Sequence, residues 1–230
     1  MLATDLPGTL RRIADIGFTQ VEPYNFTAFP ELGRGLAAAG LAAPTAHAHF
    51  IEVDPRPVFA AARELGIETV IEPQVTAERW QTADDVADIA ARLNATAKTA
   101  AEYGIRIGYH NHAHELKLID GSPALELLAE RLDDTVSLEL DAYWVIVGGQ
   151  DPVDLLRKLG ERVVALHVKD GPGTSDPRDQ VAVGNGTLPI AAILDAAPEA
   201  LRVIELDDSR GDRFTAVVDS HAFLTSLGVQ

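Results

Sequence analysis

The sequence of 230 residues contains no cysteine, which excludes disulfide bonds, thiolate nucleophiles and cysteine-ligated zinc. This absence is compatible with a reducing compartment, and we expect a cytoplasmic protein. Long apolar runs are also missing: none approaches the roughly 20 residues that a membrane-spanning helix needs. No basic and apolar leader follows Met1. We therefore expect no membrane association.

Basic residues are scarce, since 19 lysines and arginines face 35 aspartates and glutamates, for a formal net charge of −16. A surface with this charge repels phosphate backbones and anionic lipid. We therefore expect no nucleic-acid partner, and a small-molecule substrate is favoured.

Short apolar or β-branched runs alternate with longer stretches at helical spacing, a pattern typical of repeated strand–helix units around a parallel sheet. The length is sufficient for one large core, so we predict a single α/β domain over residues 1–230. The strands are predicted at residues 19–24, 43–50, 69–74, 105–112, 136–143, 163–169 and 201–207. The helices are predicted at 6–16, 31–39, 57–65, 83–103, 123–131, 152–159, 188–196 and 215–227.

Eight helices with seven strands, the helix coming first, predict a TIM (β/α)8-type barrel that lacks its first β-strand in this chain. A gap is then expected between the strand at Val21 and the strand at Val203. Because unpaired strand edges invite pairing, we expect that the chain either forms a homo-oligomer there or is preceded by a further strand upstream of Met1.

Polar residues spaced two apart occur at the end of each predicted strand, where the loops of a barrel open to its active site. Burying so many unpaired charges would cost several kcal/mol each unless they meet a ligand or one another. The set therefore indicates a site for a cation. Its pairs are Glu22 and Tyr24, His47 and His49, Glu72 and Gln74, His110 and His112, Glu139 and Asp141, His167 and Lys169, and Glu205 and Asp207.

Three of these residues, Asp141, His167 and Glu205, end neighbouring strands and offer the oxygen and nitrogen ligands that suit Mn, Mg, Zn or Co. We predict one divalent metal ion at this place. A metal-free hydrogen-bonded network is the alternative interpretation of the histidine-rich run after Tyr109, and it is favoured for His114. His221, on the last helix, is expected to serve only packing.

At these residues the sequence resembles the xylose isomerase-like barrel superfamily, and within it the sugar phosphate isomerase/epimerase group with its inosose dehydratase-like and keto-sugar epimerase-like members. The resemblance covers nearly the whole chain. The motifs that carry it are GTLRRIADIGF followed by Val21-Glu22, GYHNH with Glu115, LDAYWV at 140–145, HVKD at 167–170, VGNG at 183–186 and VIELD at 203–207.

The resemblance implies that the metal ligands are His110, Asp141, His167 and Glu205. Many epimerases of the superfamily have glutamate at the position of His110, and that glutamate doubles as an acid/base group. The histidine here is closer to the dehydratase and lyase members. Relatives also open with a strand before the first helix, which this sequence lacks.

We expect a divalent ion to polarise a carbonyl of a keto-sugar or polyol so that a neighbouring C–H loses its proton. His112 and Glu205 are the predicted catalytic residues. The predicted substrate-binding residues are Glu22, His47, His49, Trp144 and Lys169.

Several functions remain open at this point. Return of the proton to carbon gives an isomerase or epimerase, whereas loss of a β-substituent gives a lyase, either a dehydratase or a 3-keto-glycoside eliminase. A sugar-binding or partner subunit without activity is a third possibility. A DNA endonuclease of the same superfamily ranks last, because it needs a basic face.

Overall fold

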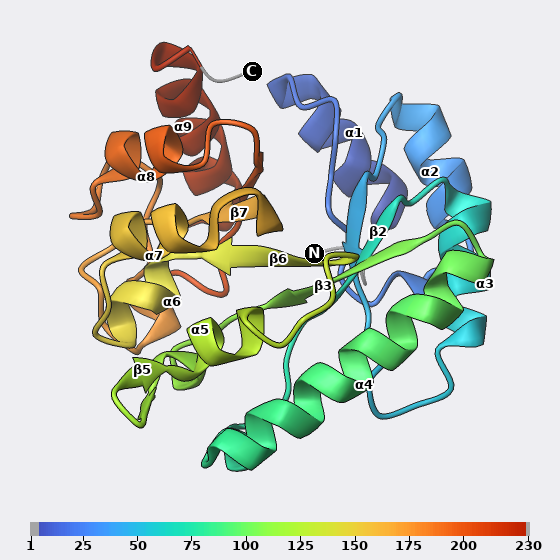
Figure 1. Cartoon of the computed structure of the whole chain (residues 1–230). Coiled ribbons are helices and arrows are strands. Elements are labelled where there is room, and N and C mark those ends of the chain that lie inside the picture. Colours follow the sequence, from blue (N-terminus) through green and yellow to red (C-terminus); the bar gives the residue numbers. More distant parts are fainter. Residues whose placement is uncertain (1–4, 229–230) are drawn as a thin grey trace.

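The computed structural model describes residues 5–228, and its centre is a curved parallel sheet (Figure 1). Its six strands stand in the order β1-β2-β3-β6-β7-β8, and every neighbouring pair is parallel. This confirms the predicted α/β barrel type. The strand bounds are β1 Thr45–His47, β2 Thr69–Glu72, β3 Arg106–His110, β6 Val136–Asp141, β7 Val163–Val168 and β8 Leu201–Ile204.

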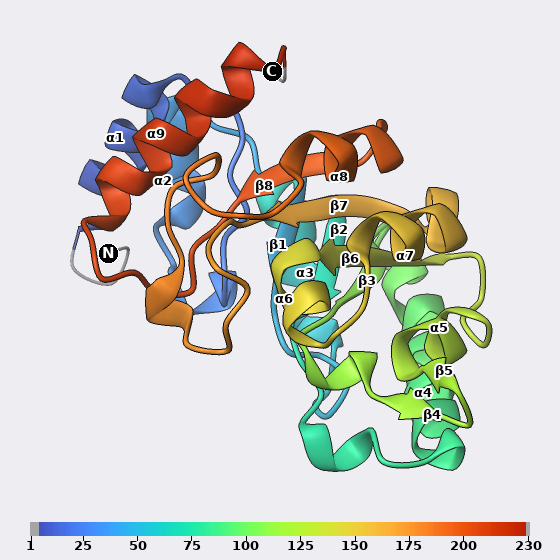
Figure 2. The ribbon, with the colours of Figure 1, turned by 90° about the vertical axis from the view of Figure 1, so that its left-hand side faces the viewer.

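Helices cover the outside of this sheet, and all eight predicted helices are present (Figures 1 and 2). Their bounds are α1 Leu6–Ile16, α2 Leu32–Ala39, α3 Arg56–Leu65, α4 Ala83–Glu102, α5 Ala124–Ala129, α7 Pro152–Leu159, α8 Ile190–Ala196 and α9 Arg213–Ser226. Among the described residues, none of the helices is long and apolar enough to cross a membrane.

Local sequence signals fix where several helices begin and end. The Thr82 hydroxyl accepts a hydrogen bond from the Asp85 backbone N–H at the start of α4, and the Asp85 carboxylate accepts one from Thr82 N–H. Gly66 ends α3 with φ of 73°, a left-handed conformation that favours glycine, and the chain then enters β2. Helix ends of this kind lead the chain from a helix into the next strand, as the barrel requires.

One helix was not predicted, α6 at Ala142–Val147, and its apolar sequence suggested the end of a strand. The Asp141 side chain decides the outcome, because its Oδ1 atom accepts a hydrogen bond from Trp144 N–H and caps the helix. A second unpredicted element is the hairpin formed by β4 (Leu118–Ile119) and β5 (Ser122–Pro123).

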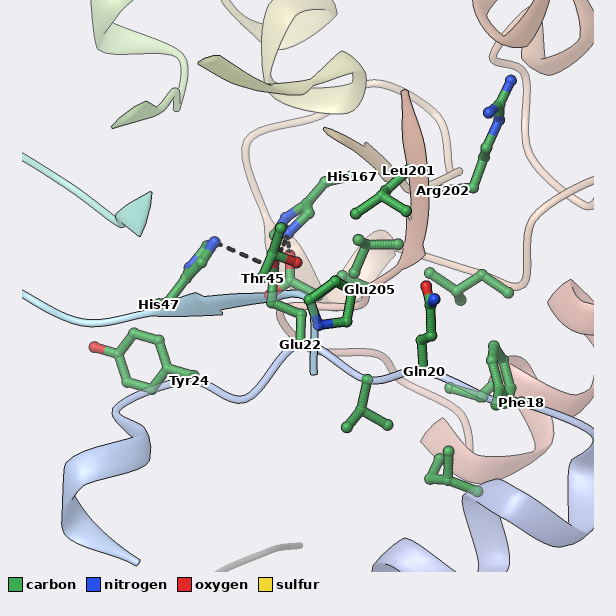
Figure 3. Close-up of a pocket in the computed structure, with 16 residues that line it drawn as sticks. Phe18, Gln20, Glu22, Tyr24, Thr45, His47, His167, Leu201, Arg202 and Glu205 are labelled. Carbon is green, nitrogen blue, oxygen red and sulfur yellow. Dashed lines mark hydrogen bonds and ion pairs between the residues drawn. The ribbon is translucent and has the colours of Figure 1, made fainter. Parts of the chain in front are cut away.

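Residues 19–24 form an extended segment beside β1 instead of a full strand. It is joined by parallel bridges between Gln20 and Ala42 and between Tyr24 and His47. A cavity of about 220 Å³ separates this segment from β8 and is lined by Val21, Val203 and further residues of both. The predicted gap between these two segments is therefore present. Figure 3 shows the residues that line this cavity.

Candidate active site

The carboxyl ends of β3, β6 and β7 bring His110, Asp141 and His167 together, and Glu205 follows directly after β8. The first three side chains are almost fully buried. Asp141 Oδ2 lies 3.9 Å from His110 Nε2 and 3.9 Å from His167 Nδ1. His167 Nδ1 lies 2.7 Å from Glu205 Oε2. The four predicted metal ligands are thus neighbours in space.

Three of them, Asp141, His167 and Glu205, form a group that we call the ligand trio, because one ligand atom of each lies within 4.8 Å of the other two. The Asp141 Oδ2, His167 Nδ1 and Glu205 Oε2 atoms are buried, and their contacts among the described residues are ion pairs with one another and with Lys169 that lack good hydrogen-bond geometry. Buried polar atoms without hydrogen bonds are costly, and a divalent cation bound by oxygen and nitrogen removes that cost. The donor set therefore fits a divalent metal.

Lys169 supplies the nearest positive charge to the ligand trio, and its side chain is fully buried. Its Nζ donates a hydrogen bond of 2.7 Å to Asp207 and lies 2.9 Å from Asp141 Oδ2 and 2.8 Å from Glu205 Oε2. Burial acts to lower the pKa of Lys169, but these three carboxylates raise it above its usual value. Lys169 is therefore a permanent cation that can hold an oxygen of a bound molecule.

The pKa values of the surrounding groups follow from burial and from neighbouring charges. Burial raises the pKa of Asp141. Burial acts in the same direction on Glu205, but His167 and Lys169 hold the Glu205 pKa well below its usual range. Burial, together with the charges of His167 and other neighbours, keeps the pKa of His110 well below its usual value. A neutral His110 imidazole is the form that binds metal.

A second cluster of Glu22, His47 and Glu139, which we call the inner network, contacts His167 and His110 through their other ring nitrogens. Figure 3 shows its Glu22 and His47 beside His167. His47 Nε2 lies 2.6 Å from Glu139 Oε2 and 3.2 Å from Glu22 Oε1. His167 Nε2 hydrogen-bonds to Glu22 Oε1 at 2.8 Å. His110 Nδ1 lies 3.1 Å from Glu139 Oε2.

The charges of the inner network balance internally. Burial acts to lower the pKa of His47, but Glu139 and Glu22 raise it to about 10. Burial, reinforced by Glu22, raises the pKa of Glu139 to about 7. Burial also acts to raise the pKa of Glu22, but His47 and His167 hold it well below its usual range. At neutral pH, His47 is therefore a cation between two carboxyl groups.

His112 lies beside the ligand trio, with its ring centroid 5.0 Å from that of His110 and 6.1 Å from that of Trp144. Burial and the nearby positive charge of Lys169 lower the pKa of His112 to about 4, so the imidazole is neutral at pH 7. Its backbone N–H donates to Glu115 Oε2 at 2.8 Å, and Glu115 Oε1 accepts from the Tyr109 hydroxyl. The buried Glu115 carboxylate thus fixes the position of His112.

The remaining predicted substrate-binding residues lie at different depths. Trp144 is half-buried, and its indole Nε1–H donates to Asp207 Oδ2 at 3.2 Å. The side chain of His49 is 57% exposed and pairs with Glu72 at 2.6 Å. Glu22 and His47 are buried in the inner network, away from open solvent. Their roles in binding substrate stay predictions.

Two histidines were expected to have no role in the site. His114 Nε2 contacts the Val75 carbonyl oxygen at 2.9 Å and stacks on His112 with a centroid distance of 6.0 Å. His221 lies against the ring of Phe18, with centroids 4.7 Å apart. Both rings have contacts that packing and hydrogen bonding explain.

Sequence reasoning missed residues that hold the loop after β7 in place. Both carboxylate oxygens of the buried Asp170 accept backbone N–H bonds, from Gly171 and Leu188 at Oδ1 and from Gly184 and Gly186 at Oδ2. The buried Gln180 donates to Asp207 Oδ2 at 2.7 Å. The glycine-rich sequence predicts a loop, but it contains no signal for these partners.

The chain is similar to known proteins in sequence and in fold. The chain is 27% identical over 144 residues to an inosose dehydratase of Geobacillus kaustophilus, a match that covers 58% of this chain and 44% of that protein. An inosose dehydratase of Clostridium tetani is 31% identical over 99 residues, covering 43% of this chain and 30% of that protein. The chain thus spans less than half the length of these curated relatives.

A solved structure with the same fold is a sugar phosphate isomerase/epimerase from Parabacteroides distasonis. It superposes with a TM-score of 0.80 at 25% identity and covers 98% of this chain and 89% of that one. The family model of the xylose isomerase-like TIM barrel matches residues 10–225. The chain therefore belongs to the xylose isomerase-like TIM barrel family.

Proposed function

We propose that the protein is a divalent-metal-dependent sugar isomerase or epimerase that removes a proton next to the carbonyl of a keto-sugar or a related polyol. The observation that carries this proposal is the ligand trio, whose three buried ligand atoms face one another, with Lys169 and the neutral His112 beside them. The similarity to a sugar phosphate isomerase/epimerase supports the same class of substrate.

His110 and the ligand trio would hold one Mn, Mg, Zn or Co ion. When bound, the ion supplies Lewis-acid polarisation of a substrate carbonyl. Nitrogen ligands from two histidines favour zinc or cobalt over magnesium, because imidazole suits the later transition metals.

The side chains around the trio would carry the proton chemistry. His112 is a suitable base, because its neutral ring has an Nδ1 atom that is buried and without a partner. Glu205, itself a member of the trio, remains a carboxylate and is the second acid/base candidate. Lys169 would hold a substrate oxygen, and the Trp144 ring beside His112 would supply an apolar wall.

Elimination is the second candidate reaction, and it is favoured by the similarity to two inosose dehydratases. The same proton would be removed by the same base, but a β-hydroxyl or β-glycosyl group would then leave instead of the proton returning to carbon. Histidine at position 110 is consistent with this outcome, since the two-carboxylate epimerases use glutamate there.

Solvent exchange tests both reactions at once. Metal-loaded protein would be incubated in deuterated water with keto-sugars, inososes and 3-keto-glycosides, and the products analysed by mass spectrometry and NMR. We expect deuterium at the carbon next to the carbonyl if the proton returns to carbon, and an unsaturated product that has lost the hydrogen of that carbon if elimination occurs. An isomerised product without deuterium would indicate a hydride shift, and ligand binding without turnover would indicate a non-catalytic sugar-binding protein.

A further inference from the structure

The two histidines of the site have the same arrangement: one ring nitrogen faces the ligand trio and the other faces the inner network. His167 directs Nδ1 toward Glu205 and Nε2 toward Glu22. His110 directs Nε2 toward Asp141 and Nδ1 toward Glu139. A neutral imidazole carries its proton on one nitrogen and binds metal through the other, so the partner of the distal nitrogen decides which nitrogen is available.

We infer that Glu22 and Glu139 are positioning residues that accept the distal N–H groups of His167 and His110 and thereby present His167 Nδ1 and His110 Nε2 to the cation. This inference rests on the cation site of the proposed function. It assigns to these two carboxylates a role other than binding substrate. His47, between them at 3.2 and 2.6 Å, holds both carboxylates in place.

The burial of the inner network supports this role. The Glu22 and Glu139 side chains are 5% and 0% exposed, and that of His47 is 8% exposed, although Glu22 and His47 also line the cavity between residues 19–24 and β8. Glu139 precedes Asp141 by two residues on β6, and both therefore point to the same face, with Glu139 about 7 Å further along the strand toward its start. The metal ligand Asp141 and the supporting residue Glu139 thus occupy consecutive inward-facing positions of the same strand.

A metal site among His47, His110, Glu139 and His167 is the alternative, because these residues also offer ligand atoms within 4.8 Å of one another. Two observations favour the supporting role. With an ion in each place, His110 and His167 would both have to bind two ions through opposite nitrogens, which requires loss of the second ring proton. Two of the contacts on this side are also hydrogen bonds already, at 2.6 Å for His47 with Glu139 and 2.8 Å for His167 with Glu22.

Metal affinity of single variants tests the inference. Zinc and cobalt binding would be measured by titration calorimetry and elemental analysis for the wild type, Glu22→Gln, Glu139→Gln and Asp141→Asn. We expect one ion per chain in the wild type and an affinity lowered by about 10- to 100-fold in each glutamine variant, the range for supporting carboxylates. The absorption bands of the cobalt form should shift in both variants.

Glu72→Gln is the matched control, because Glu72 is also fully buried and paired with a histidine, His49, but contacts neither His110 nor His167. We expect its metal affinity to equal that of the wild type. Unchanged affinity in Glu22→Gln and Glu139→Gln would overturn the inference, as would a second bound ion in the wild type that these variants lose. If Asp141→Asn also kept full affinity, the ligand trio and the proposed function would fail as well.

NMR of ¹⁵N-histidine in the zinc form of the wild type gives an answer that does not depend on the folding of any variant. We expect His167 to bind zinc through Nδ1 with its proton on Nε2, and His110 to bind through Nε2 with its proton on Nδ1. The opposite nitrogens on either ring would contradict the assignment.

Discussion

The ligand trio and the inner network use the same residue types and meet at His167, but they differ in how their facing atoms are satisfied. Asp141 Oδ2 and Glu205 Oε2 lie 3.9 and 2.7 Å from His167 Nδ1 and otherwise face the single cation Lys169 at 2.9 and 2.8 Å. In the inner network, the contacts of His47 with Glu139 and of His167 with Glu22 are hydrogen bonds of 2.6 and 2.8 Å, and a positively charged His47 lies between two carboxyl groups. The difference favours the trio as the cluster that binds a further cation.

Asp141→Asn should have the largest effect, because it removes a ligand from the trio and leaves the inner network unchanged. The amide cannot supply the anionic Oδ2 ligand, so we expect loss of the bound ion and a fall in turnover of about 10⁴-fold, the effect of losing several kcal/mol of Lewis-acid stabilisation. Elemental analysis and steady-state kinetics measure both. The exposed Asp134, just before β6, provides the same substitution as a control. Full metal content and activity in Asp141→Asn would show that the trio does not bind the metal ion.

His112→Asn separates proton transfer from metal binding. We expect turnover to fall by about 10²- to 10⁴-fold, the contribution of a general acid/base, while the metal content stays at the wild-type level. His221→Asn is the control, since that ring packs against Phe18 far from the trio. Loss of metal from His112→Asn, or an unchanged rate, would show that His112 is not the base.

The inner network should give the metal-free protein a distinct pH dependence of stability. The folded-state pKa of His47 is raised to about 10 from 6.5, so its stabilisation is complete below pH 6.5 and is lost as the pH rises toward 10. At about 1.4 kcal/mol per unit, this contributes at most about 5 kcal/mol.

Chemical denaturation of the metal-free wild type and of His47→Asn between pH 6 and 10 measures this contribution. We expect the variant to be less stable at pH 6.5 and the difference in unfolding free energy to shrink toward pH 10. A difference that is constant over this range would mean that His47 carries no charge in the network.

Asp170→Asn should have the smallest effect, because it changes the support of a loop and neither cluster directly. The asparagine amide group cannot accept the backbone N–H bonds that one carboxylate oxygen now accepts. We expect the unfolding free energy to fall by about 1 to 3 kcal/mol with metal affinity unchanged. Thermal denaturation with a parallel metal titration checks both, and lost metal affinity would show that the loop shapes the site.

The sequence was sufficient to predict the barrel type, six of its strands and the residues of the ligand trio. Strand ends can be read from the sequence because polar residues interrupt the apolar runs at His110, Asp141 and His167, and a parallel sheet places those ends at one edge. The segment at residues 19–24 was predicted as a strand but has only isolated bridges, because its outer edge faces the gap and has no partner strand among the described residues.

The roles of the inner residues could not be predicted in the same way. The two-residue spacing places Glu139 and Asp141 on one face, but it does not show that Glu139 reaches His47 and His110. Glu22 and His47 were assigned to substrate binding because they end strands. Their contacts depend on side-chain conformations and on which ring nitrogen faces which carboxylate. A sequence pattern predicts neither of these.

Anomalous diffraction from crystals of the zinc- or cobalt-loaded protein tests the central claim most directly. We predict one peak, within about 2.0 to 2.2 Å of His110 Nε2, Asp141 Oδ2, His167 Nδ1 and Glu205 Oε2, with Glu22 and Glu139 outside the coordination sphere. A peak among Glu22, His47 and Glu139, or no peak near the trio at full metal loading, would contradict it.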